Sequence, residues 1–209
     1  MRRILAVSVV ILLCSLALFA ATSPTNNCGT GADVVITSGK VWTNPSNITS
    51  SGQIAIVVPV AGGFSDYLAA TNFGFSIPGG TTINGVQISF SRAGATNGPN
   101  PSPILDNSIF LTKNGTVAVG TDHSSSSFWT NSYTVQNYGS TTDLWGTTLA
   151  PADVNASTFG VLISVENTST FSQPAAVQAF VTITVTYSGG SHSFSPGIIG
   201  TITRNVITY

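Results

Sequence analysis

The chain has 209 residues, of which 42% are hydrophobic and 6% are charged, and its formal net charge is -1. This balance excludes a basic surface for nucleic acid and an acidic surface that would concentrate cations. The hydrophobic content is too high for a disordered chain, and the length left after removal of a leader suits a single domain with one core.

The first residues predict an export signal. Arg2 and Arg3 precede an apolar run from Ile4 to Ala21 that ends in small residues. A positive start followed by one short apolar run is typical of a secretory signal peptide. A membrane anchor is the alternative, because the run reaches the lower limit of a spanning length. We expect residues 1–23 to be a signal peptide cleaved near Ala20–Ser23, and the mature protein to be secreted, extracellular or at the cell surface, with no stable membrane anchor.

Cys28 is the one cysteine that remains once this leader is removed. No intramolecular disulfide can then form, even in an oxidising compartment. The position of Cys28 near the new N-terminus predicts a frayed segment. A buried or simply unpaired thiol is the favoured state, and pairing with another chain is the alternative.

Alternation of apolar and polar residues with period two recurs through the mature sequence and predicts strands with one buried face. The clearest case runs from Val177 to Tyr187, where the odd-numbered positions are apolar. We expect Val181, Ile183 and Val185 on this face to be buried together with residues 86 and 88. Strands are predicted over residues 33–37, 53–60, 86–91, 108–112, 116–120, 160–166 and 177–187.

Turn-forming residues separate these strands. Lys113-Asn114-Gly115-Thr116 predicts a type I′ hairpin, because Asn-Gly accepts positive φ at both central positions. Residues 94–103 predict a long loop, and Pro151–Val154 predicts one helical turn. Many short strands separated by turns predict an all-β fold with antiparallel sheets, a β-sandwich of the jelly-roll kind.

The sandwich is expected to span residues 24–188, with a linker and a β-prone tail over residues 189–209. Ser188-Gly189-Gly190-Ser191 has the composition of a flexible linker. The tail that follows is too apolar for a solvated end, so it either packs on its own sheet or pairs with another molecule. Self-association through the tail is therefore a hypothesis, and the residues that would carry it are Ile198, Ile199, Ile202, Val206, Ile207 and Tyr209.

Several short motifs occur in a fixed order along the mature chain. They are Ser65–Leu68, Thr71–Pro78, Ile83–Val86, Asp106-Asn107, Leu111–Lys113, Tyr138-Gly139, Asp143–Gly146, Pro151–Asn155 and Phe159–Val161. In this order they resemble a β-sandwich module of uncharacterised bacterial secreted and surface proteins and of phage structural (tail) proteins. The resemblance implies the sandwich fold and an extracellular or virion-surface setting, and it implies no defined activity, catalytic residue or cofactor. The tail after Gly190 departs from the usual ending of that module.

No constellation of residues predicts catalysis. The histidines, His123 and His192, stand in no recognisable motif, and no Gly-x-Ser-x-Gly elbow occurs. Asp143 and Asp153 occupy positions where an aspartate commonly caps a turn or a helix start. The Asp-x-Asp-x-Asp spacing of a calcium loop is missing. We therefore expect no catalytic residues, no cofactor and no metal.

Aromatic residues offer one candidate ligand site. The rings of Trp129, Tyr133 and Tyr138 could form a platform for a sugar, because flat apolar faces with a polar edge stack well on pyranoses. Serines before Trp129 and a Thr-Asn pair after it make this ring the better exposed candidate. Trp145 is expected in the core.

These observations favour a secreted, non-enzymatic structural or adhesive surface protein, for which assembly into a fibre or coat is an option. The partners expected are further copies of the chain, through the tail, or a glycan or other cell-surface ligand. A carbohydrate-binding module working alone is the first alternative. A phage tail or receptor-binding structural protein is the second, and the signal peptide argues against it because virion proteins assemble in the cytoplasm.

Overall fold

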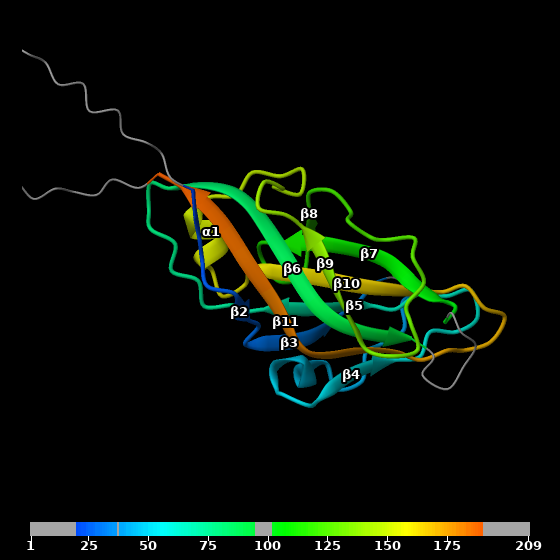
Figure 1. Ribbon diagram of the computed structural model, residues 1–209. Coiled ribbons are helices and arrows are strands. Elements are labelled where there is room, and N and C mark those ends of the chain that lie inside the picture. The colour runs from blue at the N-terminus through cyan, green and yellow to red at the C-terminus, as the bar shows by residue number, and fades with distance from the viewer. Residues whose placement is uncertain (1–19, 37, 95–101, 190–209) are drawn as a thin grey trace, which may run out of the picture.

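The computed structural model describes residues 20–36, 38–94 and 102–189, which form two antiparallel sheets packed face to face (Figure 1). This confirms the prediction of an all-β sandwich with antiparallel sheets. The strands are β1 (Ala20–Thr22), β2 (Asn26–Asn27), β3 (Thr30–Val34), β4 (Ile54–Val57), β5 (Tyr67–Thr71), β6 (Thr82–Gly94), β7 (Ile104–Thr112), β8 (Ala118–Val119), β9 (Thr134–Gly139), β10 (Gly160–Asn167) and β11 (Ala175–Ser188), and the helices are the 3-10 helix η1 (Pro45–Thr49) and α1 (Pro151–Asn155).

The larger sheet has six strands in the order β1-β11-β6-β9, with β2 and β4 also paired to β11. Strand β6 pairs with β11 along its length, while the other edge of β11 is covered in turn by β4, β2 and β1. Ala20 pairs with Ser188, and Ser23 exchanges hydrogen bonds with Val185. Strand β1 thus lies within residues 1–23, which the sequence predicts to be a leader, and the domain bounds stay a prediction.

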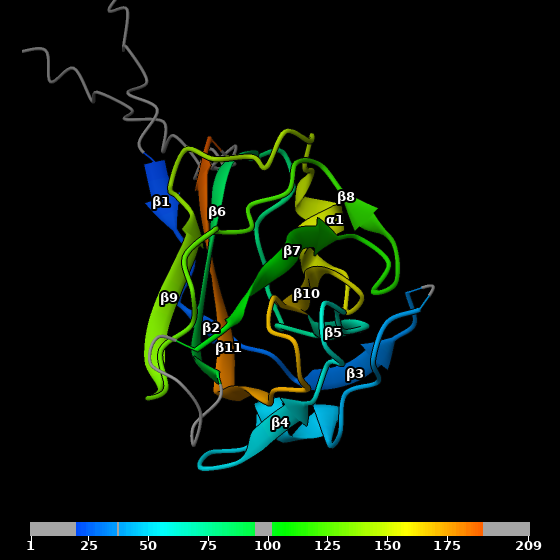
Figure 2. The same ribbon diagram turned by 90° about the vertical axis from the view of Figure 1, so that its right-hand side faces the viewer.

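The second sheet has five strands in the order β3-β5-β10-β7-β8. Figure 2 shows β3, β5, β7 and β10 on one side of the molecule and β6, β9 and β11 on the other. A jelly roll joins eight strands as two Greek keys. The observed strand orders do not establish that connectivity, and the jelly roll stays a prediction.

The core lies between the two sheets, as the alternation predicted. Val181, Ile183 and Val185 are buried together with Val86 and Ile88 and belong to one hydrophobic cluster. Burial of this continuous face supplies most of the free energy that holds the sheets together. Trp145 is also buried in the cluster, which confirms its predicted place in the core.

The turn between β7 and β8 corrects one sequence prediction. The two strands pair as an antiparallel hairpin, but residues 113–117 form a longer connection than a type I′ turn. Gly115 has φ of 84°, whereas Asn114 is not in the left-handed region. The Asn114 carboxamide oxygen instead accepts the backbone N–H groups of Thr116 and Val117 at 3.0 and 2.8 Å. This local side-chain turn replaces the positive φ that Asn114 would otherwise need.

The sequence predicted a frayed segment around Cys28, and this prediction is wrong. Its N–H donates to the Val181 carbonyl oxygen at 3.0 Å, and its thiol donates to the Ile48 carbonyl oxygen at 3.5 Å. The side chain is buried, and burial raises the pKa of the thiol to about 11. The expectation of a buried thiol is confirmed.

Other expectations fall outside the described residues. These are the leader up to residue 19, most of the 94–103 loop, His192, and the tail residues Ile198, Ile199, Ile202, Val206, Ile207 and Tyr209. No helix within the described ranges is long and apolar enough to cross a membrane.

Candidate functional site

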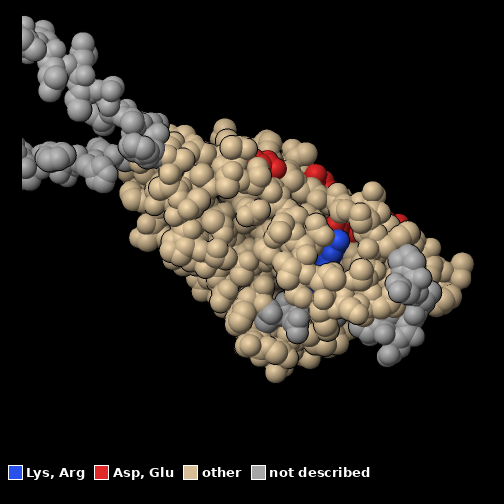
Figure 3. All heavy atoms as spheres, in the orientation of Figure 1, with Lys and Arg blue, Asp and Glu red and all other residues tan. Residues whose placement is uncertain are grey.

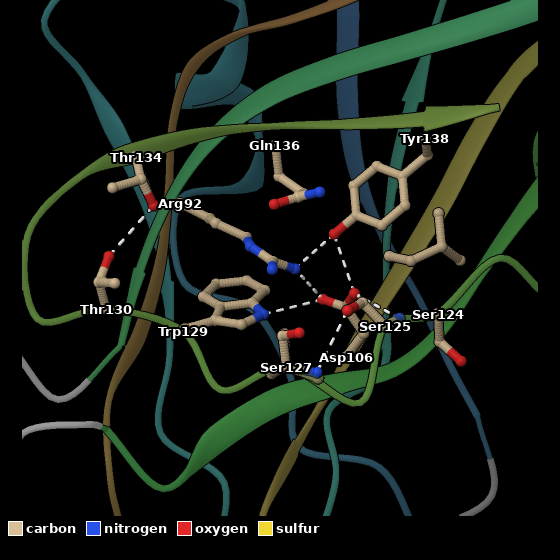
Figure 4. A network of polar contacts seen from close by, with 12 residues as sticks. Arg92, Asp106, Ser124, Ser125, Ser127, Trp129, Thr130, Thr134, Gln136 and Tyr138 are labelled. Carbon is tan, nitrogen blue, oxygen red and sulfur yellow. Dashed lines mark hydrogen bonds and ion pairs between the residues drawn. The ribbon is translucent and has the colours of Figure 1, made fainter. Parts of the chain in front are cut away.

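The densest group of polar side chains lies between the two sheets (Figure 4). Arg92 stands on β6, Asp106 on β7, Tyr138 on β9, and Trp129 in the loop before β9. Arg92 and Asp106 belong to opposite sheets, so their contact ties one sheet to the other. We call these four residues the Arg92 network.

A bulge in β7 explains why Asp106 points inward. Ser164 of β10 pairs with Ser108, but the next residue, Val165, pairs with Asp106, so Asn107 is the extra residue. An extra residue switches which face the following side chains occupy. As a result Asp106 is buried between the sheets even though its position breaks the alternation set by residues 109 and 111.

Asp106 is the centre of the Arg92 network. Its carboxylate accepts hydrogen bonds from Arg92, from the Trp129 indole N–H at 2.8 Å and from the Tyr138 hydroxyl at 2.9 Å. It also accepts the backbone N–H of Ser125 at 2.9 Å. The Arg92 guanidinium lies over the Trp129 ring, with 4.9 Å between its central carbon and the ring centroid, a cation–π contact.

The charges of the network are buried and paired. Arg92 and Asp106 are 4% and 3% exposed, and burial of either charge alone would carry a large desolvation cost. Burial, followed by the negative charge of Asp106, raises the pKa of the Tyr138 phenol far above its ordinary value. The phenol therefore keeps its proton and donates a hydrogen bond to Asp106. The network offers no exposed acid or base, and its geometry serves to join the sheets and hold the loop at Ser125.

Two of the three predicted ligand-binding rings belong to this network. Trp129 is 1% exposed and Tyr138 is 5% exposed, so the prediction that Trp129 is the exposed candidate is wrong. The physical reason is that the Trp129 indole N–H is needed by Asp106 and its ring covers Arg92. Only Tyr133, at 38%, presents much surface, and the three rings form no stacking platform.

A second polar cluster joins two loops beside β8. His123 lies 2.7 Å from the Asp143 carboxylate through Nε2 and 3.0 Å from the Thr121 carbonyl oxygen through Nδ1. The imidazole stacks on Trp145 with 4.0 Å between ring centroids. Both ring nitrogens therefore face oxygen atoms of neighbouring residues. Within the described ranges no hydroxyl or thiol is hydrogen-bonded to His123.

Hydrogen bonds within the loop set the pKa of the Asp143 carboxyl. Burial acts to raise the pKa of its carboxyl, but the Trp145 backbone N–H and the His123 ring outweigh burial and hold that pKa below its ordinary value. The Trp145 N–H donates at 2.7 Å. Asp143 thus caps the turn in which Trp145 has φ of 58°, as the sequence predicted.

Backbone capping is a common property of the aspartates. Each aspartate in the described chain accepts at least one backbone N–H, and Asp153 caps the start of α1 through the N–H of Ala150 at 2.9 Å. The other donors are Trp42 for Asp33, Ile36 for Asp66, Ser125 for Asp106, Ile109 and Ser124 for Asp122, and Trp145 for Asp143. The aspartate carboxylates of the described chain therefore stabilise the backbone around them.

Sequence reasoning missed Arg92, although a signal was present. Val86, Ile88 and Phe90 alternate inward along β6, and Arg92 is the next residue in that row. A cation at the end of a buried row requires a buried anion nearby. That requirement points to a carboxylate on the facing sheet, which is Asp106.

We also searched the described residues for surface grooves and for groups of metal-binding side chains. An open groove of about 660 Å³ lies beside β1 and is lined by neutral residues, including Thr82, Ile83 and Leu144. Among the residues that the structure places, no three His, Cys, Asp or Glu side chains are grouped so that they could hold a metal ion. No protein-family model and no curated protein matches this chain.

Proposed function

We propose that this protein is a secreted, non-enzymatic structural or adhesive protein that acts at a cell surface and assembles with copies of itself. The observation that carries the proposal is that the aspartates are occupied by hydrogen bonds from the backbone. Each one in the described chain accepts a hydrogen bond from a backbone N–H group, and the buried pair of Arg92 and Asp106 lies between the sheets. Chemistry of the acid–base or paired-carboxylate kind would need such groups free in a cleft.

The surface of the sandwich supports a role in assembly. Figure 3 shows a face on which charged residues are few and scattered. The basic residues of the described chain are Lys40, Arg92 and Lys113, and Arg92 is buried. An uncharged exterior rich in hydroxyl groups lets subunits pack closely without repulsion between like charges. Export, the first condition for this role, rests on the leader of residues 1–23.

The carbohydrate-binding alternative has less support. Stacking on a sugar needs exposed rings in a row. Trp129 and Tyr138 are instead buried and hydrogen-bonded to Asp106 inside the Arg92 network. Tyr133 alone offers one edge of such a platform. We therefore place assembly ahead of glycan binding.

Comparison of the secreted full chain with a chain that ends at Gly190 tests the proposal. Light scattering after size-exclusion chromatography should give a mass above that of a monomer for the full chain and a monomer mass for the shortened one. Thermal unfolding of both serves as the folding control. Equal monomer masses at high concentration would reject assembly through the tail, and binding of the monomer to a glycan array above background would support the alternative.

A further inference from the structure

Strand β9 forms an open edge of the larger sheet. It pairs with β6 over Thr134–Gly139 and stands last in the strand order. In Figure 2 it lies at the margin of its sheet. Within the described ranges, no strand and no backbone–backbone hydrogen bond lies beyond its outer side. Half of the backbone N–H and C=O groups of such an edge point outward and are free to pair with another strand.

The usual protections of an edge strand are missing from β9. Its six residues include no charge and no proline, and its register with β6 is continuous without a bulge. Val135 adds an apolar side chain that is 66% exposed. The opposite edge of the same sheet is covered by β4, β2 and β1. Edges that carry no charge, proline or bulge pair readily with strands from other chains.

The tail sequence supplies a segment suited to this edge. Thr201–Tyr209 contains no glycine or proline, is rich in β-branched residues, and carries Arg204 as its single charge. At about 3.3 Å per residue, this segment is longer than β9 and can cover the whole edge. We propose that the outer edge of β9 receives Thr201–Tyr209 of a second copy as an added strand. This inference rests on the proposed function and names the surface through which copies join.

The position at which the tail begins favours a second copy over the same molecule. Ser188 pairs with Thr82 at the far end of β6, beyond the last residue that pairs with β9. The segment after β9 covers the β6 edge in between, because the Val86 N–H donates to the Asp143 carbonyl oxygen at 2.9 Å and the Trp145 indole N–H donates to the Val86 carbonyl oxygen at 2.9 Å. A tail that stays in its own molecule must pass around this segment, whereas the tail of a neighbour reaches β9 directly from solvent.

Strand addition of this kind joins copies head to tail. Main-chain hydrogen bonds to β9 provide affinity, and the side chains next to the edge provide register. Each molecule donates one tail and accepts another, so the contact either closes when two copies exchange tails or passes on from copy to copy. Repetition produces an open filament unless the rotation between neighbours closes a ring.

Disulfide trapping between two differently labelled chains tests the acceptor site. Chains carrying V135C are mixed with chains carrying I202C under mild oxidation, with the buried Cys28 left in place. A disulfide-linked heterodimer is expected. Val41 is 57% exposed and lies away from β9, so V41C mixed with I202C is the matched control and should give no heterodimer. A disulfide that forms within one chain carrying V135C and I202C, but not between mixed chains, would overturn the choice of a second copy.

A charged residue introduced into β9 tests the acceptor edge separately from the proposed self-assembly. V135K in the full chain should weaken self-association at least tenfold, while V41K should leave it unchanged. If truncation after Gly190 abolishes association and V135K does not weaken it, the tail joins copies elsewhere, and β9 is not the acceptor. If truncation itself has no effect, assembly through the tail fails, and the inference fails with it.

Discussion

At the scale of single residues, the Arg92 network shows that one buried carboxylate can bind donors from several parts of the chain. The carboxylate of Asp106 meets donors from β6, β9 and the intervening loop, so its removal would leave several buried donors without a partner. The alternation along β6 is enough to place Arg92 on the inner face. The inward direction of its partner, Asp106, depends instead on the bulge at Asn107. A bulge is decided by long-range pairing, which no local pattern in the sequence contains.

Replacement of Arg92 by methionine should destabilise the domain strongly. The substitution keeps much of the side-chain volume but leaves Asp106 as an unpaired buried charge, which costs about 3–5 kcal/mol. Urea unfolding followed by tryptophan fluorescence measures the loss. R92K keeps the charge and should cost less than R92M. A loss below about 1 kcal/mol for R92M would contradict the assignment of a buried ion pair.

The lowered pKa of Asp143 predicts a dependence of stability on acid. A carboxyl whose pKa is lower in the folded state contributes stability above its unfolded pKa and loses that contribution as the pH falls through the folded pKa. The free energy of unfolding should therefore decline below the ordinary aspartate pKa of about 4, and less steeply in D143N. Urea midpoints measured across the acid range check this. Parallel acid profiles for D143N and the parent chain would refute the role of this carboxylate.

At the scale of elements, the sequence predicted the strands whose own residues alternate and missed those defined by their partners. β6 and β11 are long and alternate clearly, and both were expected. β5 has three apolar residues in succession, Leu68 to Ala70, and β9 is mainly polar, so neither carries a period of two. Their extended form comes from pairing with β10 and β6, and strand propensity depends strongly on such neighbours. For the same reason, the serines before Trp129 suggested an exposed loop, although the ring itself is anchored by Asp106.

The buried face of β11 supports a direct test of its assignment. Ile183 is fully buried opposite Ile88, so I183A removes methyl and methylene groups from a packed core and should cost about 2–5 kcal/mol. Q87A, on the exposed face of β6, should change stability by less than about 0.5 kcal/mol. Chemical denaturation of the two variants beside the parent gives both values. Equal, small losses would mean that the face is assigned wrongly.

At the scale of the whole molecule, the sandwich offers proteases few places to cut. Trypsin needs a lysine or arginine in a locally unfolded segment, and the described chain has Lys40, Arg92 and Lys113. Arg92 is buried, the backbone at Lys40 is hydrogen-bonded to Phe64 and Asp66, and the Lys113 ammonium is held by Asp153 and the Thr148 carbonyl oxygen. Native mature protein should therefore keep residues 24–189 in one fragment, which mass spectrometry after digestion can verify. Early cleavage after Lys113 would show that the β7–β8 connection opens by itself.

The contact between Ser125 and Asp106 has a consequence for motion. Ser125 belongs to a run of serines that is largely solvent-exposed, yet its amide proton points at a carboxylate that both sheets hold in place. Exchange of that proton with deuterium requires the carboxylate to be released, and release disturbs the packing between the sheets. We therefore expect the Ser125 amide to exchange with deuterium about as slowly as amides in the middle of β6, and far more slowly than its serine neighbours. A surface loop would then share the opening free energy of the core, and it would open and close together with the two sheets.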